Sequence, residues 1–183
     1  MQSDLHRNFV LHFGEMGSRW GINRTVGQIY ATIFLSENAV CADDLVEMLG
    51  ISRSNVSMGL KELMAWNLLR VERHPGDRRD FFSTPEDLWE IVRTLIEERK
   101  KREIDPTLSM LRGLELDAGT EDYAGKRVSQ MREMIELMVE FHHDMNKLET
   151  ERLVQLLKLG ARVQKFAGTT DKILPLRRKS ARS

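Results

Sequence analysis

Two short helix patterns lie almost end to end between Ala42 and Leu63, and no other feature of the sequence restricts the fold as strongly. The first, in "CADDLVEMLG", has acidic residues in its first turn and ends at Gly50, which suits a left-handed C-cap. The second begins again at Ser52, a good N-cap, and runs to about Trp66. We therefore expect two helices joined by one tight turn, a helix-turn-helix.

The second of these helices has one apolar face and one small, polar, cationic face. At about 100° per residue, Val56, Leu60 and Leu63 share one side. The opposite side and its flank carry Ser54, Ser57, Met58 and Lys61. Short side chains let a helix backbone approach base edges in the major groove, where a few donors can bind bases and phosphates. This face is therefore expected to read DNA.

The next segment, "LLRVERHPGDRRDFFST", changes from a helical to a strand pattern. An apolar run at Leu68, Leu69 and Val71 precedes a turn at Pro75-Gly76-Asp77, and Phe81 follows it. This pattern predicts a small two-stranded hairpin with arginines at its tip. Helix, tight turn, helix and hairpin occur in the order of a winged helix-turn-helix.

The rest of the chain is expected to be helical. The N-terminal helix has an apolar repeat at Leu5, Phe9, Phe13 and Met16. Further helices are expected from Asn23 to Ser36, from Thr84-Pro85-Glu86 to a break before Pro106, around residues 108–114, and over 121–147 and 149–166. The fold class is thus mainly α with a small β-hairpin wing, that is, a winged helix-turn-helix plus a long helical dimerisation region.

Three segments are expected. Residues 1–85 form the winged helix-turn-helix with its N-terminal helix, residues 86–167 a helical dimerisation region, and residues 168–183 a disordered basic tail. The dimerisation region owes its name to helix 121–147, which has a narrow apolar seam of the kind that packs on a partner helix. The seam consists of Val128, Met131, Ile135, Met138, His142 and Met145.

The run "LVEMLGISRSNVSMGLKELMAWNLLRVERHPGDRRDFFST" resembles the winged-helix segment of the MarR superfamily, and more narrowly its GbsR-like branch. The resemblance covers roughly residues 20–115, and its motifs "ISRSNVS" and "PGDRRD" are fairly specific together. It implies a homodimeric bacterial transcription regulator, often a repressor, whose long terminal helices form the dimer. The implied partner is double-stranded DNA with a pseudo-palindromic operator.

The resemblance also implies which residues bind DNA. The recognition helix and its start would contribute Ser52, Arg53, Ser54, Asn55, Ser57, Met58 and Lys61, and the wing would contribute Arg73, Arg78 and Arg79. Arg79 is the first choice for the minor groove, because a narrow, negative groove attracts a guanidinium. An alternative remains open, in which Asp77 and Asp80 merely pair with these arginines on a solvated turn.

Other features exclude little or point elsewhere. The net charge is zero, so total charge gives no argument for nucleic acid. No signal pattern and no membrane-spanning stretch occur, which predicts a cytoplasmic protein without membrane contact. The single cysteine, Cys41, is expected to be a small buried or capping thiol. No nucleophile elbow or phosphate loop is present, so we expect no enzyme activity, no cofactor and no metal.

Three alternatives remain open at this stage. The acidic residues Glu37, Asp43, Asp44 and Glu47 slightly favour a winged-helix protein-interaction module without DNA binding. Glu140 and His143 form half of a di-iron motif, which would need a second half. A small-molecule effector pocket, favouring a quaternary ammonium ligand by cation–π attraction, could be lined by Phe9, Phe13, Trp20, Trp89 and Phe141.

Overall fold

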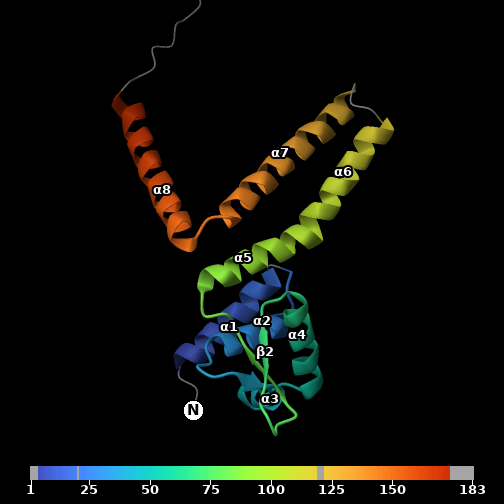
Figure 1. Cartoon of the computed structure of the whole chain (residues 1–183), viewed down its shortest axis with the longest axis vertical. Coiled ribbons are helices and arrows are strands. Elements are labelled where there is room, and N and C mark those ends of the chain that lie inside the picture. The colour runs from blue at the N-terminus through green and yellow to red at the C-terminus, as the bar shows by residue number, and fades with distance from the viewer. Residues whose placement is uncertain (1–3, 20, 119–121, 174–183) are drawn as a thin grey trace, which may run out of the picture. The chain divides into compact units, whose positions relative to one another are not determined.

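The computed structural model of the chain describes residues 4–19, 21–118 and 122–173. It confirms a mainly α-helical fold with one small antiparallel sheet (Figure 1). The elements are α1 (Asp4–Arg19), α2 (Arg24–Phe34), β1 (Val40–Cys41), α3 (Ala42–Leu49), α4 (Arg53–Ala65), β2 (Arg70–Arg73), β3 (Asp80–Ser83), α5 (Leu88–Arg99), the π-helical turn η1 (Lys100–Ile104), α6 (Asp105–Ala118), α7 (Tyr123–Asn146) and α8 (Thr150–Ile173). Two compact units divide the chain, Met1–Thr107 and Leu108–Ser183.

The core of the first unit lies where α2, α3 and α4 meet the sheet. It consists of Val26, Ile29, Ile33, Leu45, Val56, Leu60, Leu63, Leu68 and Phe82, all buried. The apolar face predicted for α4 is therefore the buried one. A Cβ at Gly59 of α4 would come within 2.5 Å of the Ile29 Cδ1 atom. An alanine at this position would therefore force the end of the Ile29 side chain to shift.

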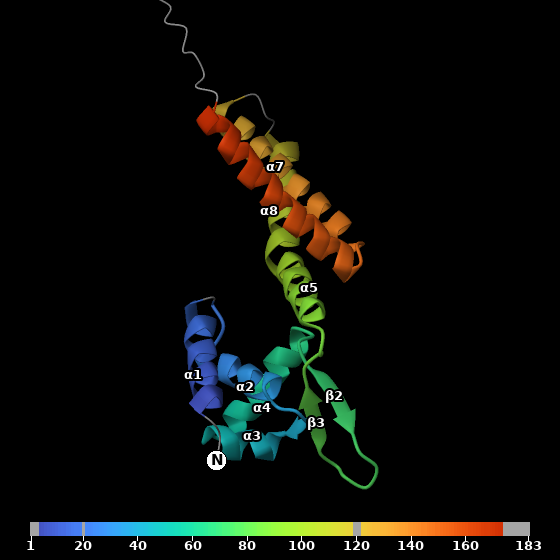
Figure 2. The same ribbon diagram turned by 90° about the vertical axis from the view of Figure 1, so that its left-hand side faces the viewer.

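The sheet has three strands rather than the two that the sequence predicts. β3 lies between β1 and β2, and both pairings are antiparallel, with Val40 opposite Phe82 and Arg73 opposite Asp80. Figure 2 shows the β2–β3 hairpin projecting beside the helices α3 and α4. β1 has only two residues, too short a run to show an alternating pattern. The third strand fixes the base of the hairpin to the start of α3.

Helix α1 packs on α2 at a close crossing formed by glycines, with large apolar residues of its repeat beside it. Val10, Gly14 and Gly17 are buried, whereas of the predicted apolar repeat Leu5 is exposed and Phe9, Phe13 and Met16 are half-buried. At Gly27 of α2, a Cβ would lie 2.9 Å from the backbone oxygen of Phe13. Small residues allow this close backbone approach, and the rings of Phe9, Phe13 and Phe34 stack beside the crossing.

Neither Pro85 nor Pro106 marks the helix boundary that the sequence predicts for it. Helix α5 begins at Leu88, not at Thr84-Pro85-Glu86, because the Asp87 carboxylate caps it by accepting from the Trp89 N–H at 2.9 Å. The helix break expected before Pro106 is wrong. The π-helical turn η1 joins α5 to α6, and Pro106 is the second residue of α6, where a missing N–H is tolerated.

The sequence places a domain boundary after residue 85, and the compact units meet after Thr107. The difference arises because α5 packs on the winged-helix core through Ile91 and Leu95. An amphipathic α5 looks the same in sequence whether its apolar face meets this core or a partner helix. The assignment of DNA binding, dimerisation and a tail to the three segments stays a prediction.

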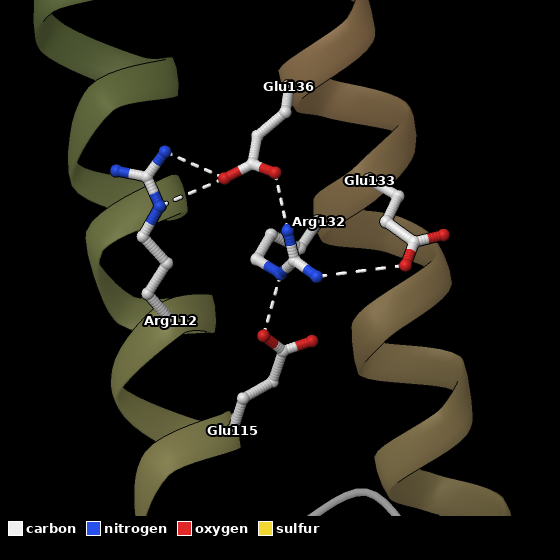
Figure 3. Close-up of polar contacts among 5 residues, drawn as sticks. All are labelled: Arg112, Glu115, Arg132, Glu133 and Glu136. Atoms are coloured by element: carbon white, nitrogen blue, oxygen red, sulfur yellow. Dashed lines mark hydrogen bonds and ion pairs between the residues drawn. The ribbon is translucent and has the colours of Figure 1, made fainter.

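In the second unit, ion pairs join α6 to α7 (Figure 3). Arg132 Nε of α7 lies 2.6 Å from Glu115 Oε2, and Arg112 Nη2 of α6 lies 2.7 Å from Glu136 Oε1. Arg132 also pairs with Glu136, one turn along its own helix. A hydrogen bond from Ser129 and the neighbouring Arg132 lower the pKa of Glu115.

The end of the chain departs from the predicted disordered tail. Helix α8 continues to Ile173, so residues 168–173 are helical, and 174–183 lie outside the described residues. The length of a helix depends largely on tertiary packing, which the polar sequence of residues 168–173 does not indicate. Within the described residues, none of the helices combines the length and the apolar character that crossing a membrane requires.

Candidate nucleic-acid interface

The tight turn between α3 and α4 has the geometry that its residues predict. Gly50 ends α3 in the left-handed region with φ of 64°, which costs glycine little. The Ser52 hydroxyl then accepts from the Asn55 N–H at 3.2 Å and caps α4. Because the turn is this short, the direction of α4 is fixed by α3 and the core rather than by a flexible loop.

One side of α4 is buried and the other is open to solvent. Each residue that the sequence assigned to DNA contact on this helix is exposed, namely Ser52, Arg53, Ser54, Asn55, Ser57, Met58 and Lys61. Met58 is 61% exposed, unusually open for a large apolar side chain, and Lys61 makes no hydrogen bond or ion pair with any described residue. The face is thus free of the protomer's own structure.

Arg53, the first residue of α4, forms an ion pair with Asp43 in the first turn of α3. Both side chains are more than half exposed. An exposed pair of this kind contributes little to stability, so a phosphate can replace the carboxylate at small cost. This ion pair was not predicted from the sequence, although the sequence contains both residues.

The wing carries its arginines on both strands and on the turn between them. Gly76 takes φ of 85° in the turn, and the Asp77 carboxylate accepts from the Arg79 backbone N–H at 3.0 Å. The same carboxylate receives the Arg79 guanidinium, with Nη2 2.6 Å from Oδ2. These bonds lower the pKa of Asp77 to about 2 and raise the pKa of Arg79.

The Arg79 side chain is also supported from the base of the wing. Its guanidinium lies 5.2 Å from the ring centre of Phe81, and its Nη1 lies 3.7 Å from the sulfur of Cys41. Cys41 is buried at the N-cap position of α3, which agrees with the predicted small buried thiol. The direction of Arg79 is therefore set by Asp77 in the wing turn together with residues of β1 and β3.

The other wing arginines differ from Arg79. Arg73 Nε lies 2.7 Å from Asp80 Oδ1, across the register of β2 and β3, whereas Arg78 makes no ion pair with any described residue. Asp80 and Asp77 thus do pair with wing arginines, namely with Arg73 and Arg79, and the choice between this alternative and DNA contact stays open. Such exposed pairs are weak, so they orient the arginines without withdrawing them from an anionic partner.

A polar junction fixes the far end of α4 to α5. Asn67 takes a positive φ of 54°, and its Nδ2 donates to Glu98 Oε1 at 2.9 Å. Arg102 donates to the Ala65 carbonyl and lies 4.3 Å from the ring centre of Trp66. Glu98 is buried, and hydrogen bonds from Asn67 and Lys101 lower its pKa. Sequence reasoning missed this junction because its partners are about 30 residues apart.

A cavity of about 640 Å³ lies in the first unit between α1, α2 and α5. Its walls are almost wholly apolar, with the aromatic residues Phe13, Tyr30 and Phe34 on one side and Leu88, Ile91, Val92 and Leu95 on the other. Burial raises the pKa of Tyr30 to about 12. Of the aromatic residues that the sequence suggested, Phe13 lines the cavity; Phe9 stacks behind it, and Trp20 lies outside the described residues. Trp89 and Phe141 are not among the lining residues.

The structure does not support a metal site at Glu140 and His143, the half of a di-iron motif seen in the sequence. Both side chains are exposed on α7, and no group of three potential ligands among the described residues could hold a metal ion.

Comparisons with known proteins agree with this geometry. Residues 20–80 match the MarR family. The repressor GbsR of Bacillus subtilis strain 168 is 24% identical over 98 residues, 54% of each chain, and the putative regulator YvaV of the same strain is 23% identical over 88 residues, 48% of this chain and 50% of YvaV. The chain thus spans about half the length of these relatives.

A solved structure described as a transcriptional regulator shares the fold. Its TM-score is 0.65 at 17% identity, over 76% of this chain and 93% of that one. The relatives GbsR and YvaV are named as a transcriptional repressor and a putative transcriptional regulator. Residues 20–80, which include the α3–α4 turn and most of the wing, thus resemble the MarR family, and the relatives that the chain matches are GbsR and YvaV.

Proposed function

We propose that this protein is a sequence-specific, double-stranded-DNA-binding transcription regulator. The observation that carries the proposal is the division of α4, whose apolar side is buried and whose small, polar and cationic side is open from Ser52 to Lys61. Short side chains there allow close approach to base edges, and Lys61 and Arg53 suit phosphates. The paired wing arginines add a second contact beside the recognition helix.

We further propose that the protein acts as a homodimer in the cytoplasm. Two copies of α4, about 34 Å apart, would enter successive major grooves of a pseudo-palindromic operator. Repression is the proposed sign of regulation, supported by the name of the relative GbsR.

The apolar cavity supports a response to a small molecule. Its aromatic side, formed by Phe13, Tyr30 and Phe34, suits an apolar or quaternary ammonium ligand. Such an effector would bind one geometry of the dimer better than another and shift the population that fits the operator. Helix α5 lines this cavity, and its Glu98 binds Asn67 just after the end of α4. A ligand that displaces α5 would therefore also displace the recognition helix.

Salt-dependent binding to heparin and to a mixed-sequence duplex tests the DNA-binding proposal. The full chain should be retained, and Lys61→Ala should elute at lower salt, because one phosphate contact is lost. Lys158→Ala, a matched loss of one exposed cation on α8, is the control and should elute with the wild type. If Lys61→Ala and the wild type elute at the same salt concentration, the proposed contact between α4 and DNA is wrong.

The second candidate is a protein-interaction module, favoured by the exposed carboxylates of Glu37, Asp43 and Glu47, of which Asp43 pairs with Arg53 at the start of α4. A protein of this kind would bind neither heparin nor duplex. Failure of the wild type to bind either polyanion at low salt would therefore favour this candidate over the DNA-binding one.

A further inference from the structure

One apolar side chain, Met58, lies among polar residues on the open face of α4. It is 61% exposed, and within the described residues it neither belongs to the core nor packs on it. At about 100° per residue it lies about 200° around the helix from Val56, which is wholly buried. Met58 therefore projects away from the core, toward the space that DNA occupies in the proposed complex.

The neighbours of Met58 along this face are a small hydroxyl and a cation. Ser54 lies four residues before it and Lys61 three residues after it, so each is about one helical turn away, and both are exposed. The short Ser54 side chain lets the helix backbone approach base edges. Methionine reaches further than serine and has three rotatable bonds, so its terminal methyl group can adjust to the shape of a base edge.

The major groove offers one apolar group to such a side chain. Base pairs present hydrogen-bond donors and acceptors there, and the C5 methyl group of thymine is the apolar exception. The Met58 thioether has no donor and only a weak acceptor, so it would desolvate a polar base edge without replacing the lost hydrogen bonds. Contact with a methyl group carries no such cost.

A protein partner fits this part of α4 less well than a base does. The cores of protein interfaces are built from several large apolar or aromatic residues in contact. The neighbours of Met58 on the open face include Ser54, Asn55, Ser57 and Lys61 instead. One methionine is too small for an interface core, but it matches a single methyl group in size.

We propose that Met58 selects thymine at one position in each half-site of the operator, by contact with the C5 methyl group. Cytosine methylated at C5 presents the same group and is recognised in the same way. The inference rests on the DNA-binding function proposed above and names one base that α4 reads. Because the preference comes from burial of one methyl group, its loss should lower the affinity about fourfold for each half-site.

Uracil replacement tests the contact, because deoxyuridine pairs as thymidine does and lacks only the methyl group. The full chain first selects a duplex from a random pool, and each thymine of the enriched duplex is then replaced in turn. Gel shifts with the wild type should show about fourfold weaker binding for one position in each half-site. Met58→Gln, similar in length but polar, should bind the thymine and uracil duplexes equally.

Two variants serve as controls for the loss of the methionine. Met58→Leu keeps an apolar side chain at the same position and should retain the thymine preference. Met64→Ala removes the other methionine of α4, which lies on the flank of the helix, and should also retain it. Equal binding of the two duplexes by Met64→Ala would mean that the preference does not come from Met58.

Cytosine methylation tests the same methyl group on another base. With cytosine at the contacted position, methylation at C5 should raise the wild-type affinity about fourfold and leave that of Met58→Gln unchanged. A uracil effect that persists in Met58→Gln would come from duplex shape and overturn the proposal.

The remaining outcomes separate this contact from the function on which it rests. An enriched duplex in which no thymine responds to uracil overturns the thymine contact and leaves DNA binding intact. A wild-type chain that enriches no sequence refutes the contact together with the sequence-specific function. A wild-type chain that binds no duplex refutes both as well, and favours the protein-interaction candidate.

Discussion

The carboxylate of Asp77 holds the guanidinium of Arg79 from two sides, with Oδ2 2.6 Å from Nη2 and Oδ1 3.0 Å from Nε, while it also accepts from the Arg79 backbone N–H. An arginine held in this way has already lost much of its side-chain freedom before any ligand arrives. Binding through a preorganised side chain costs less entropy than binding through a free one. We therefore expect the pair to lower the entropic cost of the DNA contact proposed for Arg79.

The pKa of Asp77 should reveal this pair in solution. A carboxyl titration by NMR should give a pKa of about 2 for Asp77 in the wild type, and Arg79→Ala should return it toward 3.8. Because the folded pKa is lowered, the pair is fully formed above the ordinary carboxyl pKa and is lost as pH falls through about 2. Arg78→Ala serves as the control and should leave the Asp77 pKa low. An ordinary Asp77 pKa in the wild type would contradict the pairing.

Removal of Arg79 should weaken DNA binding and reduce its dependence on salt. The slope of log K against log salt should become shallower by about 1 in Arg79→Ala, since one phosphate-directed cation is lost. Gel shifts with a mixed-sequence duplex over a range of salt concentrations measure this slope. Wild-type affinity for Arg79→Ala at every salt concentration would refute the role of the wing.

Removal of the ion pair between Asp43 and Arg53 should strengthen DNA binding, whereas removal of Arg79 should weaken it. Asp43→Asn should strengthen duplex binding several-fold, because Arg53 no longer exchanges a carboxylate for a phosphate and a negative charge near the DNA is removed. Glu47→Gln removes an exposed acid from the same helix without freeing an arginine and should have a smaller effect. Weaker binding by Asp43→Asn than by the wild type would show that the pair positions Arg53 rather than competing for it.

The glycine between α4 and α2 should be sensitive to substitution. Gly59→Ala should lower the free energy of unfolding by about 1–3 kcal/mol, because its Cβ would overlap Ile29 Cδ1 in a packed core. Gly113→Ala on α6 is the matched control, since its Cβ would meet nothing within 4 Å, and there alanine should stabilise the helix by up to about 1 kcal/mol. Urea unfolding of both variants decides the point. Equal stability of the two would mean that the end of the Ile29 side chain moves aside without cost.

Local chemistry in the sequence was enough to predict the elements that form the site. Gly50 and Ser52 bound the α3–α4 turn, and the spacing of Val56, Leu60 and Leu63 separates the buried side of α4 from its open side. These features depend on neighbours within about one helical turn. The placement of each DNA-contact residue on the open face follows from that spacing, and the contacts themselves stay a prediction.

The features that sequence reasoning missed depend on distant partners. The glycines of α1 face α2 because Gly27 lies there, and the Asn67–Glu98 bond joins segments about 30 residues apart. The two-residue strand β1 is stabilised by Phe81 and Phe82 and has no pattern of its own. Pro106 continues a helix because the π-helical turn before it changes the backbone register. None of these relationships produces a periodic signal.

Selection of duplexes from a random pool by the full chain tests the central claim most directly. The account predicts enrichment of a pseudo-palindrome whose half-sites lie about one helical turn apart, and loss or change of that preference in Ser57→Ala or Lys61→Ala with dimerisation intact. A wild-type pool that retains random sequence after repeated selection would contradict it.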